Sequence, residues 1–194
     1  MEDKNNWSLQ IDDFELSDFD NPINLLESIK KKTVVCNENN ILQDNSGDTM
    51  VSLFADELLN MKTSYSYKPV LLLALIEKAN VQGEALISDV VDFFINFYSS
   101  RKGRGLIVEK DDSTFVKNVS DRVSAKRTII TYPVAVFEKK KFIFFNKATG
   151  IITIVPSIWN VVTQDNRKLI SKHCLRSIEQ YYCRVQKERE KTMT

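Results

Sequence analysis

The sequence predicts a mostly helical α+β domain. Glycine and proline are scarce, at 5 and 4 among 194 residues, which favours long helices over loop-rich β-structure. Several segments repeat apolar residues at helical spacing, and two β-rich runs flank a glycine-containing turn near residue 150. The composition, 43% hydrophobic and 27% charged, is that of an ordinary globular protein and excludes collagen-like or wholly disordered chains.

The first 20 residues combine acidic charge with apolar anchors. They contain seven acids and one lysine. Disordered charged tails lack such apolar residues. We therefore interpret this segment as an extended arm that packs on the folded part of its own chain or on another subunit. A mobile tail is the alternative. The anchors, which we predict to bind a partner, are Trp7, Leu9, Ile11, Phe14 and Phe19.

A short helix and a linker are predicted to follow the arm. Asn21 before Pro22 predicts the helix start, because proline suits the first helical position. Residues 36–48 are rich in Asn, Asp, Ser and Gly, which predicts a linker. We therefore divide the chain into an acidic arm with a short helix (1–47) and a folded domain (48–194).

The central segment predicts two packed helices. Asp48 is placed to cap a first amphipathic helix over about 49–61. Pro69 then opens a helix that is apolar on nearly every side and is expected to be buried. After a turn at 80–83, Ser88 is predicted to cap a second helix that extends to Tyr98. Two helices joined by a short glycine-containing turn form a helix-turn-helix unit.

The second half predicts a β-hairpin and a long final helix. Residues 106–109 suggest a short strand, and 113–123 a short helix. Residues 141–145 and 151–155 are β-rich and predict the hairpin. Pro156 then opens a short helix, and Asp165 is placed to cap a C-terminal helix that becomes polar and frays from Gln186.

Helix, turn, helix and hairpin follow one another in the order of a winged-helix domain. The predicted fold is therefore a winged-helix-like core with a β-hairpin and a long C-terminal helix, preceded by an acidic N-terminal arm.

Several segments also resemble a module of bacterial restriction and phage-defence proteins. Its pattern, Tyr-Lys-x-x-Leu-Leu … Phe-Tyr-x-x-Arg … Gly, lies there beside helicase or HNH-nuclease domains. The similar segments here are Ser66 to Leu75, Phe94 to Arg101, Gly105 to Glu109, Tyr132-Pro133 through Trp159, and Tyr181-Tyr182, so the resemblance covers about 62–185. No helicase or nuclease domain accompanies them. The resemblance implies a separate small subunit of a defence complex, such as the third component of an SMC-type (Lamassu-like) system, and no catalytic residues.

The charge is unevenly distributed. The chain has a net charge of +1, but residues 1–60 carry four lysines against thirteen acids, which leaves −9 there and +10 in the remainder. A basic body suits a polyanion or an acidic arm. The candidate DNA-binding residues are Arg101, Lys102, Arg104, Arg122, Lys126, Arg127, Lys139, Lys140, Lys141 and Lys147. The sequence pI of 7.6 lies below the value above 9 that is typical of DNA-binding domains, which favours protein interaction.

One enzymatic alternative remains. An apolar run before Glu138 and Lys140, with Asp121 upstream, superficially matches a metal-dependent nuclease pattern of two carboxylates and a lysine. No metal or cofactor is otherwise expected. Gly103-x-Gly105 lacks the other residues of a nucleotide-binding loop, and the single histidine, His173, has no Asp or Cys partner at helical spacing. The three cysteines lack C-x-x-C spacing and are expected to be free thiols.

We therefore expect a non-catalytic accessory subunit of a bacterial antiviral defence complex. It would dock on a larger ATPase or nuclease subunit, with DNA as a further candidate partner. The alternatives are a stand-alone winged-helix DNA-binding regulator and a small Mg²⁺ nuclease. No apolar run is long enough to cross a bilayer, and the start Met-Glu-Asp-Lys-Asn-Asn lacks secretory features, so we expect a cytoplasmic location.

Overall fold

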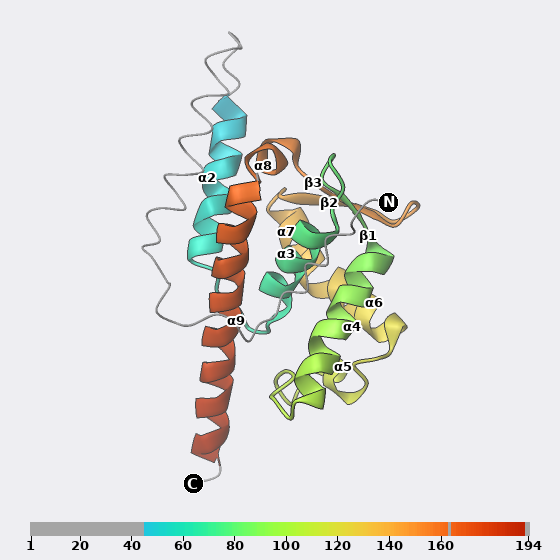
Figure 1. The fold of residues 1–194 in the computed structure, drawn as a ribbon, viewed down its shortest axis with the longest axis vertical. Coiled ribbons are helices and arrows are strands. Elements are labelled where there is room, and N and C mark those ends of the chain that lie inside the picture. Colours follow the sequence, from blue (N-terminus) through green and yellow to red (C-terminus); the bar gives the residue numbers. More distant parts are fainter. Residues whose placement is uncertain (1–44, 163, 193–194) are drawn as a thin grey trace, which may run out of the picture.

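The computed structural model describes residues 45–162 and 164–192 (Figure 1). This part of the chain is mostly helical, with one small antiparallel sheet and a long C-terminal helix, as the sequence predicted. The helix at Asn21-Pro22 and the five arm anchors lie outside the described residues. The division into an arm and a domain therefore stays a prediction.

Helices dominate the order of elements. The elements are α2 (Asn45–Leu59), α3 (Tyr67–Lys78), β1 (Glu84–Leu86), α4 (Ile87–Gly103), α5 (Thr114–Lys117), α6 (Arg122–Ile129), η3 (Ile130–Val134), α7 (Ala135–Lys139), β2 (Ile143–Asn146), β3 (Ile151–Ile154), α8 (Pro156–Val161) and α9 (Gln164–Thr192). The segment η3 is a π-helix that joins α6 to α7 without a break.

Helix α3 is the centre of the core, which confirms its prediction as a buried helix. Eight of its 12 residues are buried, and Leu71 and Leu75 have no exposed surface. It packs against α4, η3 and α9. Figure 1 shows α9, the longest of the described helices, beside α2, and the two helices are in contact.

The sheet contains the predicted hairpin and one unpredicted strand. Strands β2 and β3 form the hairpin, and β1 pairs with the other edge of β3, giving the order β1-β3-β2. Strand β1 has only three residues, too few to show an alternating pattern. It forms because Ala85 pairs with Ile152 across the sheet and because the Asn80 side chain accepts the Glu84 N–H at 3.0 Å.

Three predicted helix starts were wrong. Helix α2 begins at Asn45 rather than after Asp48, α4 begins at Ile87 rather than after Ser88, and α9 begins at Gln164, before Asp165. For α4, the backbone N–H of Ile87 donates to the Gly150 carbonyl in the hairpin turn at 2.8 Å. The predicted fraying from Gln186 was also wrong, because α9 stays helical to Thr192.

Residues 106–109 do not form the predicted strand. Two backbone carbonyls of this segment accept hydrogen bonds from side chains instead. The Arg101 Nε–H donates to the Ile107 carbonyl at 2.9 Å, and the Tyr182 hydroxyl donates to the Val108 carbonyl at 2.7 Å. The predicted helix over 113–123 is divided into α5 and the start of α6. Asp121 separates them by capping α6, where it accepts the N–H groups of Val123 and Ser124.

Gly83 gives a direct test of the packing between the β1 turn and α8. Its φ is +81°, and an added Cβ would lie 2.7 Å from Cγ of Trp159. We expect Gly83→Ala to lower the free energy of unfolding by about 2–4 kcal/mol, through backbone strain and the clash with the ring. Chemical denaturation measures this change. Gly103→Ala is the matched control, because a Cβ added there would have nothing within 4 Å and alanine favours helix; equal effects of the two changes would contradict the packing.

Candidate functional site

A buried carboxylate, Glu109, organises the most polar part of the interior. Its side chain has no exposed surface. One oxygen, Oε2, accepts the backbone N–H of Ser66 at 3.0 Å and the Ser66 hydroxyl at 2.6 Å. The other, Oε1, accepts the Lys110 N–H at 3.2 Å. We call Ser66, Tyr98, Arg101, Glu109 and Tyr182 the polar cluster.

Two tyrosines extend the polar cluster to α4 and α9. The Ser66 hydroxyl lies 2.7 Å from the Tyr98 hydroxyl and 3.2 Å from that of Tyr182. Because Ser66 donates its proton to Glu109, Tyr98 donates to Ser66. The Tyr182 hydroxyl donates to the Val108 carbonyl. The cluster therefore joins the segment before α3, the end of α4, the loop after α4 and α9.

Arg101 belongs to this cluster. Its guanidinium carbon lies 3.5 Å from the centroid of the Tyr182 ring, a cation–π contact, and burial lowers its pKa. Its Nε–H is donated to the Ile107 carbonyl. Arg101 was a predicted DNA-binding residue, but these contacts hold its guanidinium against the interior.

The chemistry of the polar cluster is structural. A serine hydroxyl bonded to a carboxylate is the geometry of an activated nucleophile. However, both Ser66 and Glu109 have no exposed surface, so no substrate reaches them. Burial raises the pKa of the Glu109 carboxyl to about 7, against the opposing effects of its hydrogen bonds and of Arg101. The carboxyl therefore titrates near neutral pH inside the folded domain.

The last turns of α9 contact the segment before α3 and the loop after α4. Arg184 donates to the Thr63 carbonyl, and Arg189 donates to the Glu109 carbonyl at 3.4 Å and to Asp111. Lys110 pairs with Glu188 at 3.2 Å. These contacts explain why the polar end of α9 remains helical.

The predicted basic residues are spread widely along the domain. Helix α4 has 17 residues and is about 25 Å long at 1.5 Å per residue. Its first residue is hydrogen-bonded to the hairpin turn, which carries Lys147, whereas Lys102 and Arg104 lie at its far end. Figure 1 shows this separation, with the hairpin near the start of α4.

The other basic residues are all exposed, and two of them are in ion pairs. Arg122 pairs with Asp92 of α4, and Lys140 pairs with Glu57 of α2. The rest are Lys126 and Arg127 on α6, Lys139 and Lys141 around the end of α7, and Lys147 in the hairpin turn.

The nuclease pattern is not assembled. Asp121 and Glu138 lie near opposite ends of the helical segment 122–139, which is about 25 Å long. Asp121 caps α6, Glu138 accepts the Phe145 N–H at 2.8 Å, and Lys140 is paired with Glu57. Each of the three residues has a separate structural role. Within residues 45–162 and 164–192, no three His, Cys, Asp or Glu side chains gather as a metal site.

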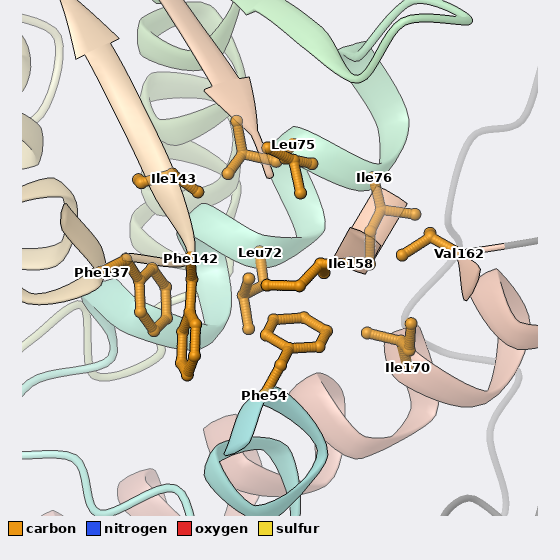
Figure 2. Close-up of a pocket in the computed structure, with 11 residues that line it drawn as sticks. Phe54, Leu72, Leu75, Ile76, Phe137, Phe142, Ile143, Ile158, Val162 and Ile170 are labelled. Atoms are coloured by element: carbon orange, nitrogen blue, oxygen red, sulfur yellow. The ribbon is translucent and has the colours of Figure 1, made fainter. Parts of the chain in front are cut away.

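The pocket in Figure 2 is a packing gap in the core. It lies where α2, α3, α8, α9 and the hairpin converge, and all its lining side chains are apolar, among them Phe54, Leu72 and Ile170. Its volume of about 10 Å³ is at most enough for one water molecule. It offers no polar group to orient a ligand.

The outer face of the sheet carries exposed apolar side chains. Phe144 on β2 is 56% exposed and Leu86 at the end of β1 is 49% exposed. Leu86 is directly opposite Ile151, and Phe144 is opposite Thr153, so these side chains lie on one face. Three polar residues, Glu84, Asn146 and Thr153, share this face. The inner face, with Ile152 and Ile154, is buried. We call Leu86, Phe144 and Ile151 the outer sheet patch.

Comparison with protein families, curated proteins and solved structures finds no match to this chain. The arrangement of helices and strands defines the chain's class as a mostly helical α+β domain with a small antiparallel sheet. None of the described helices is both long and apolar enough to cross a membrane.

Glu109 makes stability depend on pH in a defined direction. Its pKa is raised from 4.5 to about 7, so the folded state holds the proton more tightly than the unfolded state. The resulting stabilisation is complete below pH 4.5 and is lost as pH rises through about 7, an effect of about 3 kcal/mol.

Glu109→Gln removes this titration while keeping an oxygen that accepts from Ser66. Denaturation measured from pH 4.5 to 8 is expected to show that wild type loses more stability than Glu109→Gln as pH rises. The acidic arm titrates equally in both proteins, so the difference isolates residue 109. Parallel pH profiles would contradict the assignment.

Proposed function

We propose that the chain is a non-catalytic winged-helix accessory subunit that docks on a larger protein. The order of elements supports the winged-helix assignment: α3, β1, α4, α6 and then the β2–β3 hairpin, with sheet order β1-β3-β2. In this arrangement α4 and α6 are the helix-turn-helix pair and the hairpin is the wing. This pair differs from the sequence-based one, which joined α3 to α4.

The outer sheet patch is the observation that carries the docking role. A wing that contacts DNA presents basic side chains, whereas the outer sheet face here presents the exposed Phe144 and Leu86 and the half-buried Ile151, beside the uncharged Thr153 and Asn146 and the acidic Glu84. Exposed aromatic and aliphatic side chains on one rigid face are typical of protein-interaction sites. A chain near electrical neutrality, at net +1, agrees with a protein partner.

The proposed partner is an ATPase or nuclease subunit of a bacterial antiviral complex. This part of the proposal depends on the resemblance to a defence-protein module. Its support is that residues from the segments that carry the resemblance, Ser66, Tyr98, Arg101 and Tyr182, contact one another in the polar cluster. The acidic arm, with Trp7 and its other anchors, is proposed as a second docking element.

Substitution on the outer sheet patch tests the docking role. We expect Phe144→Asp to abolish co-purification with the proteins encoded beside this chain, because it replaces the most exposed aromatic side chain of the patch with a charge that the contact would bury. Val81→Asp is the matched control, since Val81 is 85% exposed in the turn before β1. Retention of the partner by Phe144→Asp, at wild-type level, would contradict the proposal.

A stand-alone DNA-binding regulator is the second candidate. The observation that favours it is the set of exposed basic residues on α6, Lys126 and Arg127, with Lys147 in the hairpin turn. In a winged helix, the third helix and the wing are the elements that contact DNA.

Titration of the isolated chain with duplex DNA decides between the candidates. If the chain is a regulator, binding weakens steeply with salt, and the double change Lys126→Glu/Arg127→Glu reduces it at least tenfold. Lys102→Glu, at the far end of α4, is the control and has a smaller effect. Absence of binding at low salt would exclude the regulator and leave the docking role.

A further inference from the structure

Three tyrosines form an aromatic cluster between the start of α3 and the π-helix η3. The rings of Tyr65 and Tyr67 are stacked, with centroids 5.1 Å apart and planes at 10°. The ring of Tyr132 lies 6.2 Å from Tyr65 and 5.9 Å from Tyr67. We call these three residues the tyrosine platform.

The platform has a rigid base and an accessible surface. Tyr67 is only 4% exposed, and its hydroxyl lies 2.7 Å from that of Ser113. Tyr132 is 50% exposed, and Tyr65 is partly exposed. Tyr132 is held by η3, whose Pro133 is buried; π-helical turns occur frequently at functional sites. The aromatic surface is therefore held in place by the fold before any ligand arrives.

One exposed carboxylate, Asp112, borders this surface. The Tyr65 hydroxyl donates to Oδ2 of Asp112 at 3.1 Å, and Asp112 is exposed. Burial, and then the negative charges of Asp112 and Glu109, raise the pKa of Tyr65. The side chain of Asp111, next in the chain, is 81% exposed. Asp111 pairs with Arg189, so Asp112 is the exposed carboxylate in contact with the platform.

We propose that the tyrosine platform binds an arginine side chain of a partner protein. A planar guanidinium stacks on a tyrosine face and at the same time donates to a carboxylate, here Asp112. An ammonium group does not stack in this way, so arginine is favoured over lysine. Guanidinium–tyrosine contacts already occur within the described residues: Arg101 lies 3.5 Å from the centroid of the Tyr182 ring, and Arg184 lies 5.5 Å from that of Tyr181.

That the bound arginine belongs to a partner protein rests on the proposed docking role. The ability of the platform to bind arginine can be tested without the partner. The probe is Nα-acetyl-arginine amide, titrated into the full chain while the tyrosine ring signals are followed by NMR. All six tyrosines of the chain, from Tyr65 to Tyr182, lie within the described residues, and the acidic arm contains none. Binding of the probe to the arm therefore does not produce a tyrosine contact.

The controls separate stacking from simple charge attraction. Nα-acetyl-citrulline amide has the same shape without the charge, and Nα-acetyl-lysine amide has the charge without the planar group. We expect saturable shifts of the Tyr132 and Tyr65 rings with arginine, and affinity at least several-fold weaker for citrulline and lysine. Tyr132→Phe keeps the π-face and retains binding, whereas Tyr132→Leu and Asp112→Asn each weaken it by several-fold up to about tenfold.

Wild-type affinity in both Tyr132→Leu and Asp112→Asn would overturn the proposal, as would equal shifts with arginine and citrulline. Thermal melting checks that each variant is folded, and Asp112→Asn, at an exposed position, serves if Tyr132→Leu does not fold. Failure here leaves the docking role untouched, because that role is decided separately by co-purification with Phe144→Asp.

Discussion

A carboxylate without contact to water needs hydrogen-bond donors from the protein. At Glu109 this requirement connects the segment before α3, α4, the loop after α4 and α9. Ser66 supplies two donors and Lys110 a third, while Tyr98 and Tyr182 complete the network around the serine hydroxyl. The loop after α4 is thereby fixed to the start of α3 and to α9. The tyrosine platform depends on the same constraint, because Tyr65 and Tyr67 flank Ser66 in the chain.

The parts of the fold that could be predicted are those with a local signal. The apolar run of α3, the β-rich hairpin strands and the proline at the start of α8 each identify their element without tertiary information. Strand β1 and the helical segment 122–139 could not be predicted in this way. The first is three residues long and depends on pairing with β3, and the second contains Pro133, which normally ends a helix but is accommodated here in a π-turn.

The candidate sites show the same division. Exposed basic residues are recognisable in a sequence, yet their positions along α4 and their pairs with Asp92 and Glu57 appear only in three dimensions. Glu109 has a weak signal, an acid directly after the apolar run Leu106 to Val108, but its burial depends on Ser66 and Tyr182, which are distant in the chain. The outer sheet patch depends on register, and the register includes the unpredicted strand β1.

We propose that this domain attaches to a larger protein through the outer face of its sheet. Hydrogen–deuterium exchange of the chain, alone and in complex with the protein that co-purifies with it, tests this claim most directly. We expect slower exchange in the complex across the hairpin, residues 143–154, and no change of exchange in the interior of α3. Unchanged exchange throughout the hairpin in a stable complex would contradict it.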